Sequence, residues 1–490
     1  MHFQYQKLAQ QIIQSIKNHE LLVGHKLKSL RDFAALHHVS ISTAQRCYDL
    51  LEAQGYLYVK PKSGYFIKDI NQLDLEHTSG HGNSLASKKS NHARLPEHPD
   101  FESIPRDVSN VILQNEIQHA SIQNHVIPLG ALQLSPPLVP IIPLRRSIQR
   151  ALKHCQPEDF LYCNKQGHIK LRQALAQHWR EDGIYISSDD IYISNGCLPT
   201  LQLLIQQLSQ EGDSVLIPTP TFNVQLLLLA NLKRKIIEIP SDHQGIDLQR
   251  LEQAMSEHKA KLCLLTANYQ NPLGYCLSDA DKQRIAQLAA KYQCIILEDD
   301  IYAECGHGNQ RPLPIKYWDN DGYVIWISSV SKSLSSAYRV GWFCLGKQLK
   351  QHIPHLLSHN VGVNTPLQLG LADFLNSRAY RQHLSQLAVK LKQHVKEYRQ
   401  AILKAFAPLN IGLSQPQGAY ALWLELPKQI DSTQLYLAAQ QQGISIVPGT
   451  VFGEDERYKH YIRINAGHAL SPEIQQSIEF LANWVKVQIA

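Results

Sequence analysis

The N-terminal part of the chain shows three helical patterns followed by a strand-like one. Apolar residues recur every three to four positions over Phe3–Lys17, which predicts an amphipathic helix. Ser29 precedes a second such stretch, with Asp32 at its third helical position as in a capping box. A third helix is predicted over Ser42–Ala53, and residues 56–68 alternate around a Pro-Lys-Ser-Gly turn, as a hairpin does. Helix, helix, turn, helix and hairpin in this order predict a winged helix-turn-helix.

The remaining pattern predicts an α/β body that follows a polar linker. Residues 69–105 are rich in Gly, Ser, Asn and His without an apolar period, which predicts a flexible linker between a head (residues 1–68) and a body (residues 106–490). A helix is predicted over Val108–Ala120. Between Tyr185 and Trp342, short apolar runs alternate with helical stretches, which is typical of a mostly parallel sheet. A second, smaller lobe is predicted from about Ile353 onward.

Composition narrows the class of protein. The 490 residues suit two or three domains. No apolar stretch approaches the length of a membrane span, and the first residues lack the basic-then-apolar order of a secretory signal, so no membrane partner is expected. Nine cysteines without a CxxC pair indicate a reducing, cytoplasmic location. The 24 histidines lack ligand spacing, so no metal site is expected.

The net charge is concentrated in the head. Residues 1–68 contain nine Lys or Arg against four Asp or Glu, a net charge of +5. The whole chain carries +6, which leaves +1 for the other 422 residues. A small basic head on a near-neutral body predicts a polyanionic partner for the head.

A lysine among small hydroxyl residues supplies candidate chemistry in the body. The segment 328–342, SSVSKSLSSAYRVGW, contains Lys332 with Ser329, Ser331 and Arg339 nearby. A lysine amine condenses with aldehydes, and proteins hold pyridoxal 5'-phosphate (PLP) on lysine in this way. Serine hydroxyls and a guanidinium are suited to its phosphate. The segment predicts a PLP site with Lys332 as the catalytic residue, although an isolated Lys-Ser pair is more often solvated surface.

Groups suited to the pyridine ring precede this segment. Asp299 follows a buried-strand pattern in IILEDDIY and is predicted to keep the ring nitrogen protonated. Tyr302 and Asn271 are predicted to contact the phenolic oxygen, and Phe222 to stack on the ring. Taken alone, these residues fit an acidic loop, an Asn-Pro turn and ordinary packing.

A strand that runs into a glycine turn comes earlier still, in IYISNGCLPT. If a helix starts there, the free backbone amides of Gly196, Cys197 and Leu198 form a phosphate cradle. Each motif is weak evidence by itself, and the prediction depends on their order along the chain.

Together with LYCNKQGHIKLR, GAYALWLEL and YIRINAG, these motifs resemble the class I aminotransferases, which are fold-type I PLP proteins. The resemblance covers most of the body. It implies PLP held as an aldimine on Lys332, with Asp299 at the ring nitrogen. It also implies that Arg463 binds a substrate carboxylate near Gly130, and that Tyr162 reaches the phosphate across a dimer interface.

The head resembles the GntR-type DNA-binding domain in KLKSLRDFAALHHVSISTAQRCYDLLEAQGYLYVKPKSGYFI. In such a domain the third helix enters the major groove and the hairpin contacts the backbone or minor groove. The resemblance implies contacts to double-stranded DNA by Arg31, Ser40, Ser42, Thr43, Gln45, Arg46, Lys62, Ser63 and Gly64. One position departs from the family, because Ile41 stands where an arginine is usual. A helical protein-interaction domain with a solvated basic face is the alternative.

A GntR-type head on an aminotransferase-like body resembles the MocR subfamily of bacterial transcription factors. The resemblance implies a homodimeric regulator that binds double-stranded DNA and responds to PLP, with an amine or amino acid as co-effector. The alternative is an active PLP-dependent aminotransferase that carries a DNA-binding domain. The reactive groups Lys332, Asp299 and Arg463 suit both functions, so the sequence leaves enzymatic turnover open.

Overall fold

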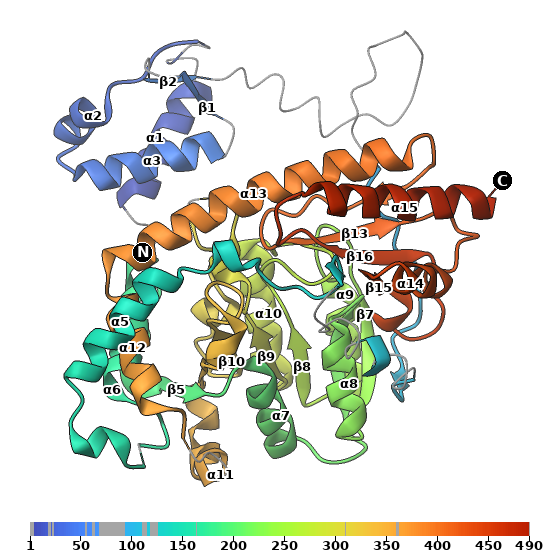
Figure 1. Cartoon of the computed structure of the whole chain (residues 1–490). Coiled ribbons are helices and arrows are strands. Elements are labelled where there is room, and N and C mark those ends of the chain that lie inside the picture. Colours follow the sequence, from blue (N-terminus) through green and yellow to red (C-terminus); the bar gives the residue numbers. More distant parts are fainter. Residues whose placement is uncertain are drawn as a thin grey trace. The chain divides into compact units, whose positions relative to one another are not determined.

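The computed structural model of the chain divides into two compact units, residues 1–91 and 92–490 (Figure 1). It describes residues 4–17, 21, 24–53, 56–60, 64–67, 94–109, 115–117, 126–162, 164–308, 310–358 and 362–489. The two units have separate hydrophobic cores.

Unit 1 is a winged helix-turn-helix, which confirms the prediction. Its elements are α1 (Gln4–Lys17), α2 (Leu30–Leu36), α3 (Ile41–Ala53), β1 (Leu57–Lys60) and β2 (Gly64–Ile67). The two strands pair antiparallel as a hairpin. The Ser29 Oγ accepts the Asp32 backbone N–H at 3.2 Å and so caps α2. The third helix begins at Ile41, one residue earlier than predicted, because the Ser40 Oγ accepts the Thr43 N–H at 3.1 Å.

The core of unit 1 forms where the apolar stripes of its helices meet the hairpin. Buried side chains come from all three helices and both strands: Leu8, Ala9, Ile16, Phe33, Ala34, Ala44, Cys47, Tyr48, Leu51, Leu57 and Ile67. Residues 44, 47, 48 and 51 share one face of α3, as helical periodicity requires. Burial of each large apolar side chain contributes roughly 1.5–3 kcal/mol, so these contacts hold the wing against α3.

Unit 2 is built on an eight-stranded sheet in the order β3-β7-β6-β8-β9-β10-β11-β5. The strands are β3 (Pro105–Arg106), β5 (Ile191–Ser194), β6 (Ser214–Thr219), β7 (Lys235–Pro240), β8 (Leu262–Leu265), β9 (Ile295–Asp299), β10 (Val324–Ser329) and β11 (Gly341–Cys344). The five central strands are parallel, whereas β11 is antiparallel to both neighbours and β3 to β7. The predicted mostly parallel sheet is confirmed.

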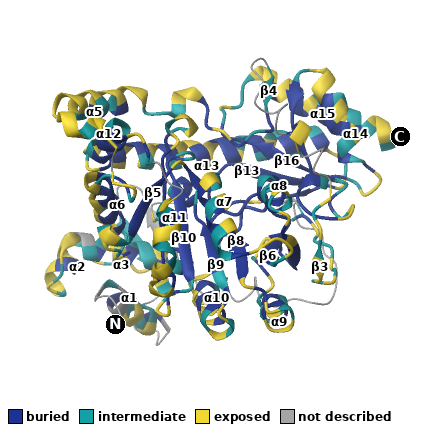
Figure 2. Cartoon of the chain, turned by 90° about the horizontal axis from the view of Figure 1, so that it is seen from below, coloured by how far each residue is buried: buried dark blue, intermediate teal, exposed yellow. Residues whose placement is uncertain are grey.

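Helices connect the parallel strands and cover the sheet. They include α7 (Cys197–Leu208), α8 (Asn223–Asn231), α9 (Leu248–His258) and α10 (Asp279–Tyr292). The strand β8 is buried along its whole length, which explains why its sequence, LCLL, is a continuous apolar run, and β10 is buried as well although it ends in Ser328 and Ser329. Figure 2 shows the buried strands, with exposed residues on the outer sides of α9 and α10.

The second lobe contains an antiparallel sheet in the order β12-β13-β16-β15. Its elements are α13 (Arg378–Phe406), β12 (Gly412–Leu413), β13 (Ala421–Glu425), α14 (Ser432–Gln441), β14 (Ile444–Ser445), β15 (Val447–Pro448), β16 (Tyr461–Asn465) and α15 (Pro472–Ile489). The early strand β4 (Ile127–Pro128) pairs with β14. The chain therefore contacts this lobe at β4, after β3 has already joined the large sheet.

The boundary of the small lobe differs from the sequence expectation near Ile353. The intervening helices are α5 (Ile141–Lys153), α6 (Ile169–Glu181), α11 (Ile353–Ser358) and α12 (Thr365–Leu375). α12 packs against α5 and α6, and its Phe374 shares a core with Trp179 and Trp326. α12 therefore belongs with the large lobe, because its apolar residues are buried there.

The end of the expected linker packs on unit 2. Residues 94–109, here called the strap, contact this unit although residues 69–105 are expected to be linker. Arg94 forms an ion pair with buried Glu425 at 3.1 Å, and the Tyr461 hydroxyl donates to the Glu97 carbonyl at 2.6 Å. These contacts are made by an ion pair and a backbone carbonyl. A search for periodic apolar residues therefore cannot predict them. In the helix expected over 108–120, residues 108 and 109 are not helical, 115–117 are, and the others lie outside the described residues.

No helix in the described part of the chain is long and apolar enough to cross a membrane.

Candidate functional site

The predicted cofactor residues gather at the carboxyl ends of the parallel strands of unit 2. Asp299 ends β9, Lys332 follows β10 and Asn271 follows β8. Phe222 caps α8 after β6, and Gly196 caps α7 after β5. Ligands of open α/β sheets bind at this edge.

Lys332 is half-buried and has a lowered pKa. Its Nζ donates to the Leu132 carbonyl at 2.5 Å and lies 5.7 Å from the centre of the Tyr302 ring. Burial, and then the positive charge of Arg463, lowers the pKa of Lys332 from 10.5 to about 8. About half of the amine is therefore neutral near pH 8, and the neutral form is the nucleophile toward an aldehyde.

Asp299 is a buried carboxylate with one open oxygen. Its Oδ2 accepts a hydrogen bond from the Gln225 amide at 3.0 Å. Its Oδ1 is buried and has no hydrogen-bond partner among the described residues. Burial, and then the charge of Asp300, raises the pKa of Asp299 from 3.8 to about 6. A protonated ring nitrogen at Oδ1 would satisfy this atom and stabilise its charge.

The neighbouring Asp300 has its hydrogen-bonding capacity filled by protein groups. Its Oδ2 is bonded by Arg311 at 2.7 Å and by the Trp326 indole N–H at 2.8 Å. Its Oδ1 accepts the Asn268 amide at 2.8 Å. Of the two adjacent acids, Asp299 is therefore the one available to a ligand.

The start of α7 brings a helix N-terminus close to a guanidinium. Gly196 caps this helix with φ +104°, and a Cβ placed on it would lie 2.7 Å from Nη2 of Arg339. That Nη2 donates to the Asn195 carbonyl at 2.9 Å. Cys197 and Leu198 begin the helix, so the groups predicted to bind the phosphate lie next to one another, and their role stays a prediction.

The serines before Lys332 differ in their hydrogen bonding. The Ser329 Oγ accepts the Ser331 N–H at 3.2 Å. The Ser331 Oγ is buried and lacks a partner within the described ranges. A phosphate oxygen is a suitable acceptor for this hydroxyl.

Arg463 connects the second lobe to the large sheet. From β16, its Nη1 donates to the Asn271 Oδ1 at 3.2 Å and its Nη2 to the Gly130 carbonyl at 2.8 Å. Burial lowers the pKa of Arg463 to about 10, so the guanidinium stays charged at neutral pH. In the part of the chain that the structure describes, its Nε and the Asn271 Nδ2 have no partner. A carboxylate and a phenolic oxygen would satisfy them.

These groups fit PLP. Four buried polar atoms around Lys332 lack partners among the described residues: Asn271 Nδ2, Asp299 Oδ1, Ser331 Oγ and Arg463 Nε. PLP with an amino acid offers a phenolic oxygen, a ring N–H, a phosphate and a carboxylate. Each of the four atoms has a suitable partner among these groups, and since buried polar atoms are rarely left unsatisfied, the residues fit this pair in chemical type.

Two further predicted residues occupy different surroundings. Tyr302 is buried and makes an edge contact with Tyr420, with ring centres 6.2 Å apart. Tyr162 is 92% exposed in the single chain, as a residue directed at a partner subunit would be.

Sequence reasoning missed Gln225 and Cys305. The Gln225 amide donates to the Asp299 carboxylate, and the Cys305 thiol donates to the Lys332 carbonyl at 3.3 Å. The only signal for Gln225 is a polar residue inside the apolar run NVQLLLLA. Its partner Asp299 is 74 residues away, so spacing could not reveal the pair.

Several residues expected to contact DNA belong to the described part of unit 1. Arg31 and Arg46 are exposed, and Ile41 is 53% exposed on the first turn of α3. Ser40 and Thr43 bond each other at 2.8 Å at this turn. Gly64 begins β2 with φ +111°.

Gln45 has contacts within the protein. Its amide donates to Asp49 at 2.6 Å and to the Tyr65 hydroxyl at 2.9 Å, so it ties α3 to the wing. A base contact by Gln45 requires these bonds to open. Lys62, Ser63 and the Ser42 side chain lie outside the described residues.

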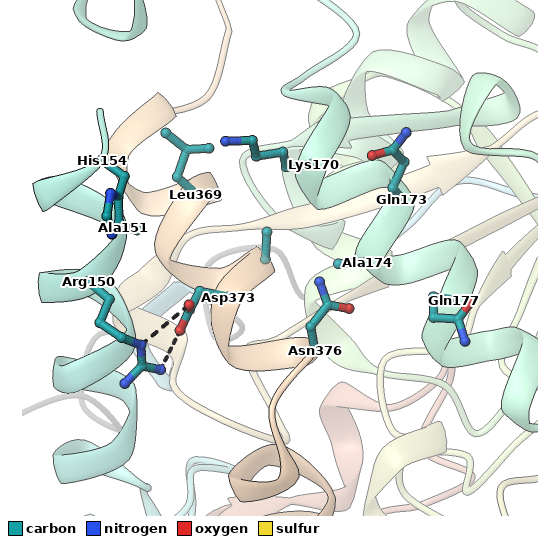
Figure 3. Close-up of a pocket in the computed structure, with 11 residues that line it drawn as sticks. Arg150, Ala151, His154, Lys170, Gln173, Ala174, Gln177, Leu369, Asp373 and Asn376 are labelled. Atoms are coloured by element: carbon teal, nitrogen blue, oxygen red, sulfur yellow. Dashed lines mark hydrogen bonds and ion pairs between the residues drawn. The ribbon is translucent and has the colours of Figure 1, made fainter. Parts of the chain in front are cut away.

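A separate pocket lies between α5, α6 and α12 (Figure 3). The Arg150–Asp373 ion pair, at 2.5 Å, forms part of its wall. It contains none of the predicted cofactor residues, and nothing in it suggests chemistry.

Known proteins resemble the chain in both parts. The family model for aminotransferase class I and II matches residues 132–479, and that for bacterial regulatory proteins of the gntR family matches residues 4–67. The HTH-type transcriptional regulators YdcR and YjiR of Escherichia coli K12 are 32% and 28% identical, over 99% and 97% of both chains. Pyrococcus horikoshii kynurenine aminotransferase is 24% identical with a TM-score of 0.70, covering 77% of this chain and 95% of its own.

The fold and the site thus define a PLP-type aminotransferase body, of fold type I, joined to a winged helix-turn-helix. The chain belongs to the GntR-type regulators with a class I and II aminotransferase domain, the MocR type. It is a DNA-binding transcriptional regulator, and its aminotransferase domain implies PLP as cofactor.

Proposed function

We propose that an amine or amino acid bound at the PLP site controls the affinity of this regulator for DNA. The observation that carries the proposal is the set of unsatisfied buried atoms around Lys332, in a chain that also contains a winged helix-turn-helix. The kinship with bacterial regulators supports action in the cytoplasm.

Each residue of the site would have a separate role in binding PLP and the amine. When bound, PLP supplies an aldehyde that captures amines and a ring that withdraws electrons. Asp299 would hold the proton of the ring nitrogen, while Asn271 would orient the ring. Arg463 would bind the carboxylate of an amino acid, because its guanidinium is charged and keeps one donor free among the described residues. Lys332 would receive or release a proton near pH 8.

A route from this site to the strap passes through the segment 449–459. Arg463 lies over the Phe452 ring, 5.2 Å from its centre. Two residues on, Glu454 accepts the Ser109 backbone N–H at 2.9 Å, and Asp455 pairs with Arg106 at 2.6 Å. The segment thus contacts both the ligand-binding arginine and the strap, through which the chain enters unit 2. Coupling requires two states of this segment with different ligand affinities.

A homodimer is part of the proposal. Phe160, Leu161 and Tyr162 are 64%, 70% and 92% exposed, which is unusual for three consecutive large apolar or aromatic residues. A second subunit that covers this run would bring Tyr162 toward the partner's phosphate site. The exposed run supports this arrangement.

Enzymatic transamination is the second candidate function. The lowered pKa of Lys332 and the position of Arg463 suit it. Steady-state conversion of an amino acid with a 2-oxo acid would favour the enzyme, and a reaction that stops after one half-turnover would favour the sensor.

The test measures binding of the purified protein to DNA from immediately upstream of its own gene, while PLP and then amino acids are titrated. We expect the affinity to change with ligand in the wild type and to stay constant in Lys332→Ala, which also loses the visible absorption band of the bound cofactor. If the DNA affinity stays the same with every combination of PLP and amine, the proposal is contradicted. A surviving absorption band shows that Lys332 is wrongly assigned.

A further inference from the structure

One helix of unit 2 carries an unusual concentration of positive charge. α13 contains seven Lys or Arg and one Glu in 29 residues, a net charge of +6. All residues after position 68 together carry only +1, so the rest of that part of the chain is net negative. α13 is a long helix that packs beside α15 in unit 2 (Figure 1).

The lysines of α13 lie on its outer face. Leu387, Leu391, Val395, Tyr398 and Ile402 are buried and fix the inner face of the helix. Four lysines are exposed at other helical positions: Lys390, Lys392, Lys396 and Lys404. From the first to the last, a rise of about 1.5 Å per residue spreads the four charges over about 21 Å of the helix axis, and the turn of about 100° per residue spreads them around its outer half.

These lysines are not neutralised by the described protein. Within the described ranges, none of the four makes an ion pair, and Glu397 is bonded by Gln393. By contrast, Arg284 and Lys291 on α10 share Glu252 at 2.6 and 2.7 Å. Like charges four residues apart, as in Lys392 and Lys396, destabilise a helix by a few tenths of a kcal/mol. An anionic partner would offset this repulsion.

We infer that the exposed lysines of α13 form a second DNA-binding surface that contacts phosphates of the duplex bound by the winged helix-turn-helix. The inference rests on the DNA-binding function of the chain. Duplex DNA carries one charge per about 1.7 Å of its axis, so lysines spread over about 21 Å of the outer half of the helix lie within reach of several phosphates. Lysine suits such contacts because it acts as a flexible point charge that needs no fixed geometry. The contacts position the protein without reading sequence.

The test is the salt dependence of DNA binding by the full-length protein. The variant is Lys390→Gln, Lys392→Gln and Lys396→Gln combined. The matched control is Lys235→Gln, Lys259→Gln and Lys347→Gln, which removes the same charge from exposed lysines elsewhere on unit 2 that also make no described ion pair. Fluorescence anisotropy with the upstream duplex gives Kd over a series of salt concentrations.

We expect the α13 variant to bind more weakly, with a slope of log K against log salt smaller by roughly 0.9 for each lost phosphate contact. The control should keep the wild-type slope. Equal slopes for wild type, variant and control overturn the inference, and the basic face then serves an acidic protein or solvent. An Arg31→Ala variant tests the DNA contact of the winged helix-turn-helix alone, so weaker binding by this variant shows that the head still binds DNA when the α13 variant has no effect. If no variant alters binding, or the wild type binds no DNA, the inference about α13 and the proposed function both fail.

Discussion

Asp299 and Asp300 are adjacent in the sequence but lie in opposite electrostatic environments. Asp300 is paired with Arg311, whereas Asp299 is buried beside a neutral amide and another carboxylate. Buried charge without a paired cation is costly, and the raised pKa of Asp299 expresses that cost. A bound cation at Oδ1 would relieve it, so the site is destabilised when PLP is absent.

Asp299→Asn should therefore stabilise the PLP-free protein. A pKa raised from 3.8 to about 6 means that the folded state resists ionisation, so stability falls as the pH rises through this window. Removal of the charge should raise the free energy of unfolding by up to about 3 kcal/mol at pH 8 and by little at pH 4. Urea unfolding at the two pH values measures this. The same variant should lose most of the stabilisation that added PLP gives the wild type.

Asp300→Asn is the matched control. It removes one of the two carboxylates paired with buried Arg311, the other being Glu304 at 2.9 Å, and should destabilise the protein by up to about 3–5 kcal/mol. The two substitutions should thus act in opposite directions at pH 8. If both destabilise the protein equally, the electrostatic assignment of Asp299 is wrong.

At the scale of elements, we propose that the contact between the strap and the segment 449–459 carries the regulation. Glu454 is buried, and the Ser109 N–H and hydroxyl both bond its Oε2. Hydrogen bonds to charged groups contribute about 1.5–3 kcal/mol, whereas the exposed Arg106–Asp455 pair contributes about 0–1 kcal/mol. Ser109 is therefore the stronger anchor of the strap on this segment.

Ser109→Ala combined with Arg106→Ala removes the hydroxyl bond to Glu454 and the ion pair to Asp455 and keeps the backbone bond, so it should weaken the coupling between the ligand and DNA. We expect the affinity for PLP to stay within about twofold, because neither residue contacts the site. The change in DNA affinity on addition of an effective amine should become smaller. Arg250→Ala is the control, since Arg250 binds the strap at Asp100, 3.2 Å away, without contacting the segment 449–459. An unchanged DNA response in the double variant contradicts the proposed route.

At the scale of the whole molecule, we propose that a second subunit completes the site. Leu161→Asp should produce a monomer, because it places a charge in the middle of the exposed run 160–162. Analytical ultracentrifugation measures the change in mass. If Leu161→Asp remains a dimer, the interface does not include the exposed run 160–162.

Tyr162→Phe tests the partner's contribution without a charge. It should leave the dimer intact and weaken PLP binding about 10- to 100-fold, the effect of losing one hydrogen bond of about 1.5–3 kcal/mol to an anion. Unchanged PLP affinity in an intact dimer would remove Tyr162 from the site.

The sequence predicts the fold of each domain better than it predicts where the linker ends and where the small lobe begins. The winged helix-turn-helix and the parallel sheet follow from apolar periodicity, because an element that buries one face must repeat its apolar residues at the period of that element. Apolar periodicity does not predict the packing of the strap, since Arg94 and Ser109 bind through charge and backbone groups. It does not predict the start of the small lobe either, because α12 shows the same helical pattern whichever lobe it packs on.

The sequence by itself determines the order of the elements and the types of reactive group, Lys332, Asp299 and Arg463 among them, since periodicity and side-chain chemistry are local. Only the tertiary structure decides which groups meet and which stay unsatisfied. Arg463 bonds Asn271 across 192 residues, and Gln225 leaves one oxygen of Asp299 open. Burial and pairing of this kind set the pKa of Lys332 and the cost of ionising Asp299, because they depend on neighbours that are distant in the chain.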